Sequence, residues 1–139
     1  MGNFNTSMPI WAPRLLSVLR IVTALLFMEH GGQKLFGFPP SQHGGPGSLM
    51  SLAGIAGMLE LFGGLFILLG LITRPVAFLL AGEMAVAYFM VHATRGFWPV
   101  LNGGELSALY CFVFIYLSVA GGGVCSVDHL RGRNNLPRG

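Results

Sequence analysis

Four apolar stretches fill most of this chain, and ionisable side chains fall inside them. Glu29, Glu60 and Glu83 lie where hydrocarbon is expected, and so do Arg20 and His30. A charged side chain at membrane depth costs free energy, so it usually faces the interior of a helix bundle and indicates a functional site. The pattern therefore predicts an all-α, polytopic membrane protein, a bundle of four transmembrane helices with a buried polar cluster.

The composition agrees with residence in a membrane. Hydrophobic residues make up 53% of the 139 residues and charged residues only 9%, whereas a soluble domain carries about 25% charged residues. Four spans of about 20 residues use roughly 80 residues, so the remainder allows short loops and tails but no soluble catalytic domain. The net charge is +3, but the basic residues are dispersed rather than gathered with aromatic residues, so we expect no nucleic-acid partner.

The apolar runs and the turn residues between them predict a single transmembrane domain over residues 1–139. No charged segment precedes the first run, so we expect no cleavable signal peptide. The Gly- and Pro-rich segments between the runs are expected to be loops. The predicted helices cover about residues 14–34, 48–72, 75–94 and 105–120, and a basic tail follows over residues 124–139.

The cations in the loops and tails predict the orientation. Four spans place both termini on one side of the membrane, together with the turn between the second and third helices. The cations on that side are Arg14, Arg74, Arg131, Arg133 and Arg138, and those on the opposite side are Lys34 and Arg95. Because cytoplasmic loops are enriched in Lys and Arg, we expect both termini in the cytoplasm.

Arg20 and Glu83 are expected to form an ion pair between the first and third helices. At 1.5 Å per residue they lie roughly 9 and 12 Å from the cytoplasmic end, and their charges are opposite. A buried pair of this kind can serve only to fix the register of two helices. We therefore assign the pair a structural role.

Glu60 is the predicted functional acid of the bundle. It lies near mid-membrane, glycines share its helix face, and no cation lies at its own depth. Since three deep acids stand against one deep base, at least one of Glu29 and Glu60 is expected to hold a proton, or to pair with Lys34, His30 or a ligand. The candidate proton-handling residues are Glu60, His30 and Glu29.

Other polar and aromatic residues are candidates for binding a ligand, and Tyr88 and Tyr110 suit contact with the ring of a quinone-like lipid. His30 and His92 lie at similar depth and are the only candidates for haem ligation, but a histidine bonded to a neighbour is the simpler interpretation, so haem is not expected. No Glu-x-x-His pair is present, and no metal site is expected. The candidate ligand-binding residues are Lys34, Tyr88, Tyr110, Asn102 and Glu105.

The cysteines argue against internal thiol–disulfide chemistry. Cys111 and Cys125 are the two cysteines of the chain. If one helix runs through both, they lie roughly 21 Å apart, whereas a disulfide needs Cα atoms within about 7 Å. An intramolecular dithiol mechanism is therefore not expected.

Several motifs, taken in order, resemble those of the DoxX family. After the helix that contains Arg20 come HGGQKLFG at residues 30–37, ELFGG at 60–64 and LGLITR at 69–74. Glu83-Met84, NGGE at 102–105 and GGGVCSVD at 121–128 follow. The resemblance spans about residues 15–128.

This resemblance implies a four-helix protein of the bacterial inner membrane, similar to the membrane subunit of thiosulfate:quinone oxidoreductase. Our first hypothesis is a redox-linked subunit that binds a quinone-like lipid or relays protons for a partner oxidoreductase. Our second is a non-enzymatic subunit that docks or stabilises a larger membrane complex. Both imply contact with membrane lipids and either a membrane protein partner or a homo-oligomer, and both leave open whether the chain is itself catalytic.

Overall fold

The computed structural model describes residues 4–40, 46 and 48–134, and all of the regular structure in these residues is helical. The first long segment is α1 (Phe4–Phe36), and the second runs through α2 (Leu52–Met58), the π-helical η1 (Leu59–Gly63) and α3 (Gly64–Leu69). The third runs through α4 (Thr73–Ala87), the π-helical η2 (Tyr88–His92) and the 3₁₀ turn η3 (Ala93–Arg95), and the fourth is α6 (Glu105–Ala120). Two short helices, α5 (Pro99–Asn102) and α7 (Val127–Asn134), precede and follow α6.

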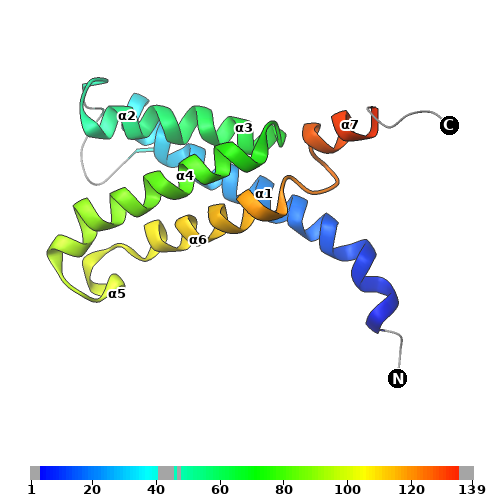
Figure 1. Ribbon diagram of the computed structural model, residues 1–139. Helices are drawn as coiled ribbons and strands as arrows, with labels where there is room; N and C mark the ends of the chain where they lie inside the picture. The colour runs from blue at the N-terminus through cyan, green and yellow to red at the C-terminus, as the bar shows by residue number, and fades with distance from the viewer. Residues whose placement is uncertain (1–3, 41–45, 47, 135–139) are drawn as a thin grey trace.

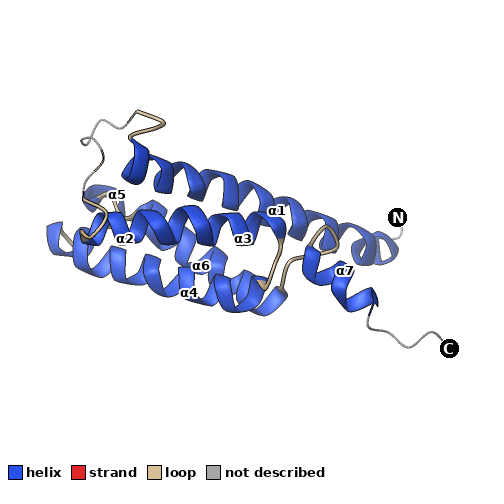
Figure 2. Cartoon of the chain, turned by 90° about the horizontal axis from the view of Figure 1, so that it is seen from above, coloured by secondary structure: helices blue, strands red, loops and turns tan. Residues whose placement is uncertain are grey.

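The four long segments form one bundle, seen from two directions in Figures 1 and 2. Segment α1 packs against the whole of α2–η1–α3, and α4 packs most extensively against α6. The core between these two pairs is apolar, and Phe27 of α1 lies edge-on to Tyr110 and Phe114 of α6, with ring centroids 5.1 and 4.8 Å apart. The start of α1 and α7 project from one end of the bundle, and α5 lies at the other (Figure 1).

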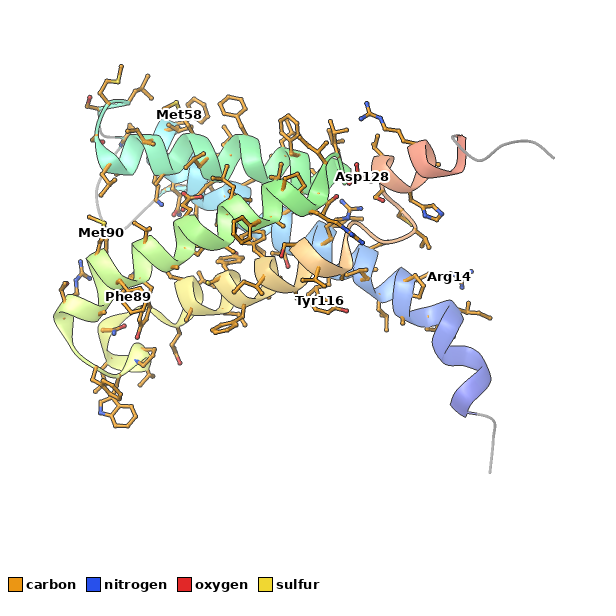
Figure 3. All side chains as sticks on the ribbon, in the orientation of Figure 1. Arg14, Met58, Phe89, Met90, Tyr116 and Asp128 are labelled. Atoms are coloured by element: carbon orange, nitrogen blue, oxygen red, sulfur yellow. The ribbon has the colours of Figure 1, made fainter. Side chains whose placement is uncertain are left out.

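The surface of the bundle confirms that the chain is an all-α, polytopic membrane protein. Three segments are long and apolar enough to cross a membrane, Ile10–Phe36, Leu52–Leu69 and Thr73–Arg95, and α6 is a shorter apolar helix. Large apolar side chains stand on the outside of all four, among them Phe78 and Phe112 at 72% and 71% exposure. Phe89, Met90 and Tyr116 point away from the bundle in Figure 3. Such a surface suits lipid and not water.

The helix ends differ from the predicted ones for local reasons. Segment α1 begins at Phe4 and not near residue 14, so Pro13 lies within the helix and not at its start. The second helix begins only at Leu52, where the Ser51 hydroxyl caps the N–H of Gly54, and it ends at Gly70 in the left-handed conformation. Helix α6 spans the predicted residues 105–120. Helix α7 lies in the predicted tail, whose last residues, 135–139, fall outside the described ones.

Asp128 joins the start of α7 to the turn between α3 and α4. Its two carboxylate oxygens accept the N–H groups of Ile72 and Thr73, each at 2.8 Å, and its own N–H donates to the Gly70 carbonyl at 2.9 Å. Ile72 is a β-branched residue at φ 44°, a conformation that costs about 1–3 kcal/mol and needs outside support. Asp128 therefore acts as the N-terminal cap of α4 from a distant part of the chain (Figure 3).

Arg20 does not pair with Glu83, so that prediction is wrong. Its side chain is fully buried, and it donates to backbone carbonyls: Nε to Gly122 at 2.8 Å, and Nη2 to Cys125 at 2.6 Å. Nη1 donates to the last-turn carbonyls of α3, to Ile67 at 2.5 Å and also to Leu68. The pair was predicted from the similar depths and the opposite charges of Arg20 and Glu83. The glycine-rich loop after α6, however, folds back over Arg20 and provides acceptors that are nearer. Arg20 thus fastens α1 to the end of α3 and to this loop.

We predict that Arg20→Met destabilises the protein by about 3 kcal/mol or more, because it leaves several buried carbonyls without donors. The apparent melting temperature in detergent and the level in membranes both report this loss. Arg14→Met, which removes an exposed arginine from the same helix, is the matched control and should change little. The loss should add to that of Glu83→Ala; rescue of Arg20→Met by Glu83→Ala would restore the ion-pair hypothesis.

We predict that the cap made by Asp128 is lost in acid. Partial burial acts to raise the pKa of Asp128, but the N–H and hydroxyl of Thr73, the N–H of Ile72 and the charge of Arg131 outweigh it and hold the pKa below its ordinary value. The stabilisation is therefore complete above the ordinary pKa of about 3.9 and disappears as the pH falls through the lower folded value. Asp128→Asn keeps only one of the two acceptor oxygens, so it should cost about 1 kcal/mol at pH 7 and nearly nothing in strong acid. Melting curves at both pH values test this, and an equal cost at both would contradict it.

Candidate functional site

The candidate site forms where α1 crosses the second helix with the two backbones in contact. A Cβ added at Gly31 would lie 2.6 Å from the backbone nitrogen of Leu61 and 2.8 Å from the carbonyl oxygen of Gly57. A Cβ at Gly57 would lie 2.8 Å from the Cβ of Lys34. Only glycine permits so close a crossing, which resembles the small-residue contacts common between membrane helices. The crossing brings Lys34 over the turn that contains Glu60.

Lys34 and Glu60 form an ion pair inside this crossing. Nζ of Lys34 lies 2.5 Å from Oε1 of Glu60, and the two side chains are 36% and 3% exposed. The prediction that Glu60 has no cation at its depth is therefore wrong, because depths were taken at the backbone. Lys34 begins near the end of α1, but its long side chain reaches one helical turn or more along the bundle. Of the alternatives given for the deep acids, pairing of Glu60 with Lys34 is the one that the structure has.

Glu60 lies on a π-helical turn, where the second helix departs from regular α geometry. Such turns are rare and occur often at functional sites, since the extra residue changes the direction of nearby side chains. The inward face predicted for this helix is confirmed, because Gly57, Glu60 and Gly64 are all buried. The turn itself follows from the tertiary packing and has no signature in the sequence.

Glu83 of α4 is the second acid of the site. Both of its carboxylate oxygens are buried and, among the described residues, accept no hydrogen bond, and the same holds for Oε2 of Glu60. Glu83 lies within electrostatic range of both Glu60 and Lys34. Lys34 thus pairs with Glu60 and lies near Glu83 without contacting it, and three carboxylate oxygens are free to bind a proton or a donor. We call Lys34, Glu60 and Glu83 the carboxylate cluster.

An aromatic wall borders the carboxylate cluster on the α6 side. Tyr110 is buried at 6% exposure, stacks on Phe114 at 6.0 Å and meets the ring of His30 edge-on at 6.1 Å. Tyr110 lies within electrostatic range of Glu29 and of Glu60. His30 and Tyr110 thus lie beside the cluster, where both were predicted to contribute to a site.

The remaining candidates lie elsewhere. Glu29 is exposed on the outer face of α1, as its position opposite Arg20 on the helix indicates. Tyr88 packs edge-on to Phe89 at 5.4 Å, and a Cβ at Gly104 would lie 2.7 Å from its ring, so it contacts a different set of residues from Tyr110.

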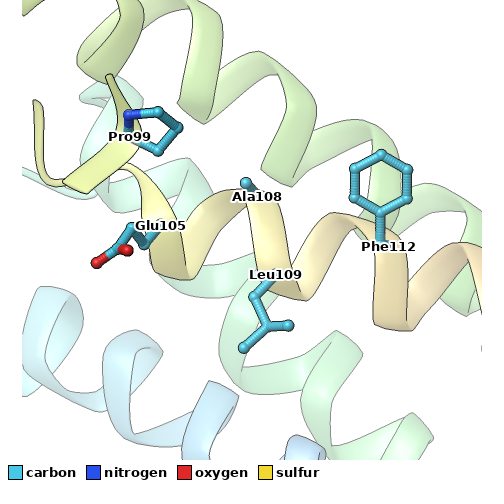
Figure 4. A pocket seen from close by; sticks show the side chains of 5 residues that line it. All are labelled: Pro99, Glu105, Ala108, Leu109 and Phe112. Carbon is cyan, nitrogen blue, oxygen red and sulfur yellow. The ribbon is translucent and has the colours of Figure 1, made fainter.

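Asn102 and Glu105 belong to the turn that leads into α6. Asn102 is buried, donates to the Gly96 carbonyl and accepts the N–H of Gly104, both at 2.8 Å, while Nδ1 of His92 lies 3.2 Å from its carbonyl oxygen. These bonds close the turn and give the Asn102 amide a structural role there. Glu105 is exposed and borders an open groove of about 440 Å³ on the outer face of α6, with Pro99, Leu109 and Phe112 (Figure 4).

Comparison with known proteins agrees with this architecture. The family model DoxX matches residues 15–93. A protein of Haemophilus influenzae described as uncharacterized is 43% identical over 123 residues, which cover 86% of this chain and 92% of that protein. The inner membrane protein YqjF of Escherichia coli is 31% identical over 120 residues, which cover 81% and 88% of the two chains.

No solved structure gives a significant match to this chain. The family match covers α1 from Leu15 onward, the whole second helix and the third as far as Ala93, and thus all three members of the carboxylate cluster. Together with a relative named as an inner membrane protein, it supports residence in a bacterial inner membrane as a multi-pass protein. The chain is a member of the DoxX family.

Proposed function

We propose that this protein is a redox-linked subunit of the inner membrane that passes protons through the carboxylate cluster for a partner oxidoreductase. The observation that supports this most is Glu83, whose two carboxylate oxygens are buried without a hydrogen-bond donor among the described residues. Buried polar groups in folded proteins are nearly always paired, and the exceptions call for an explanation. Reversible binding of a proton is an explanation that suits a carboxyl group.

Charge balance supports the same proposal. With both carboxyl groups ionised, the cluster would carry one negative charge in excess of the Lys34 ammonium. An uncompensated charge in an apolar interior costs several kcal/mol, so a single proton shared by Glu60 and Glu83 is the economical state. A second proton, or a negative group brought by a ligand, would change this balance, which is what a proton relay requires.

Binding of a quinone-like ring is the finer form of the proposal. Under it, Tyr110 and His30 would contact the ring, and Glu60 would exchange a proton with the ring oxygen. Two open cavities of the described part of the chain lie elsewhere, at the outer face of α6 and beside α7. The unpaired carboxylate oxygens support proton handling directly, whereas ring binding rests on the neighbouring aromatic side chains.

The alternative function, a non-enzymatic subunit that stabilises a larger complex, is favoured by one observation. Arg20, the other ionisable group deep in the bundle, uses its guanidinium on the chain's own carbonyls. At least one of the buried polar side chains is thus structural. A stabilising subunit would contact its partner through its apolar exterior. The two functions differ in whether the carboxylate cluster exchanges protons.

We predict that the cluster holds one protonated carboxyl group at neutral pH. Infrared spectroscopy detects this group through its carbonyl absorption and its shift in deuterated water. Glu83→Gln or Glu60→Gln should remove the absorption, and Lys34→Met should double it, because two carboxyl groups then lack a cation. All of these variants are compared in a protein that carries Glu29→Gln. Glu29 is exposed at membrane depth, and a protonated Glu29 would absorb in the same region.

Glu105→Gln is the control for that experiment, because it removes an exposed carboxylate outside the cluster. Lack of the absorption in the otherwise unchanged protein would contradict proton handling. Purification in mild detergent, followed by identification of the lipids and proteins that co-purify, tests whether a quinone or a partner protein is bound. Bound quinone that is lost in Glu60→Gln supports the finer form, whereas a Glu60→Gln protein that keeps quinone and partner supports the stabilising subunit.

We also predict that the end of the bundle from which α1 and α7 project faces the cytoplasm, so that both termini are cytoplasmic. The cations counted from the sequence favour this side by five to two, namely Arg14, Arg74, Arg131, Arg133 and Arg138 against Lys34 and Arg95. A C-terminal alkaline phosphatase fusion, which is active only outside the cytoplasm, should stay inactive, and a fluorescent protein that folds only in the cytoplasm should be bright. The reverse pair of results would invert the topology.

A further inference from the structure

A cleft of about 680 Å³ opens at the end of the bundle opposite to α5. It lies between α1, the start of α4, the glycine-rich loop after α6 and the start of α7. Its α1 wall is apolar and consists of Pro13 and Leu16, and its opposite wall includes Arg74 and His129. The cleft is thus apolar on one side and basic on the other. None of its residues belongs to the carboxylate cluster.

The charges around this cleft favour an anion. Arg74 is exposed, and its Nε lies 3.4 Å from the position that a Cβ of Gly121 would take, so the guanidinium lies along the glycine-rich loop. Asp128 is the acid that lines the cleft, but both of its carboxylate oxygens are bound to the N–H groups of Ile72 and Thr73. The Asp128 carboxylate keeps its charge, but this charge is directed at those N–H groups and is balanced by Arg131. Arg74 forms no ion pair among the described residues.

The inner part of the cleft contains a polar group without a partner. The Thr73 side chain is fully buried and lines the cleft, and its hydroxyl has no hydrogen-bond partner among the described residues. It lies close enough to Asp128 to stabilise the carboxylate, but not at hydrogen-bond geometry. The inner end of the cleft thus has a buried hydroxyl beside the capping carboxylate.

The cleft also lies at the level of the lipid head groups. Trp11 is 56% exposed and its ring lies under the guanidinium of Arg14, with 5.5 Å between the centroid and Cζ. Exposed tryptophan and arginine at a helix end are typical of the membrane–water interface. Pro13 and Leu16 of the cleft lie within about one turn of these residues, on the side toward the bundle.

We propose that this cleft binds the phosphate group of an anionic phospholipid of the surrounding bilayer. Arg74 and His129 contact the phosphate, and an acyl chain follows Leu16 along α1 toward the lipid-facing surface. Basic clefts between helix ends bind anionic lipids by the same combination of charge and apolar wall. This inference rests on membrane residence alone and is independent of the proposed proton relay.

Native mass spectrometry of the purified protein tests this proposal with phosphatidylglycerol, phosphatidylcholine and inorganic phosphate as probes. Phosphatidylglycerol should bind more tightly than phosphatidylcholine, and Arg74→Gln should weaken it about fivefold, the effect of one cation near a membrane surface. Arg95→Gln, which removes an exposed arginine at the opposite end of the bundle, is the matched control and should leave binding unchanged. Val124→Trp fills the cleft without a change in charge and should also remove the bound lipid.

Three results would overturn the proposal. Equal binding of the two lipids would remove the role of the anionic head group, and an equal loss in Arg74→Gln and Arg95→Gln would reduce it to a general surface charge effect. Displacement of the lipid by inorganic phosphate at equal concentration would make this a site for a free anion. If Arg74→Gln does not fold, judged by gel filtration and melting temperature, the wild-type lipid preference and its loss in Val124→Trp decide the question.

Discussion

The need to satisfy every polar group inside the protein governs this structure, because the bilayer offers no water to hydrogen bond with buried groups. Arg20 meets this need at one end of the bundle. It has no charged partner, but it donates to carbonyls from the end of α3 and from the loop after α6. These carbonyls belong to the last turn of α3 and to the loop after α6. A single side chain on α1 therefore holds three segments together that are distant in the sequence.

Asp128 binds backbone at the same end, where it caps α4. In the carboxylate cluster, Lys34 and Glu60 pair with each other, but Glu83 and one oxygen of Glu60 remain without donors among the described residues. In the described part of the chain, the buried polar atom without a partner at the Arg20 end is the Thr73 hydroxyl, which is neutral. Because a buried carboxylate without a donor costs more free energy than a buried hydroxyl, the carboxylate cluster is the better candidate for function.

The sequence was sufficient for the fold and for only part of the site. Apolar runs and buried charges predicted four helices with an inner polar stripe, and the spacing of Gly57, Glu60 and Gly64 predicted the inward face of the second helix. It could not predict partners, because a helical wheel places backbones and not the ends of long side chains. Lys34 reached Glu60 along the crossing, and Arg20 found carbonyls of a loop whose path no periodicity describes. The π-helical turn at Glu60 and the cap by Asp128 likewise arise from tertiary contact.

The depths of the three cluster residues bear on what a proton could do there. Lys34 lies level with Gly57, about one helical turn nearer the α5 end than Glu60, and Glu83 lies roughly 18 Å along its own helix from Arg95. Under the proposed relay, the three groups would form a path that enters from the α5 end and ends near mid-bundle. Toward the other side the next ionisable group is Arg20, whose donors are all directed at carbonyls, so the path does not continue across the membrane. An arrangement of this kind suits delivery of a proton to a redox group held at mid-depth or by a partner subunit, and it does not suit conduction from one face of the membrane to the other.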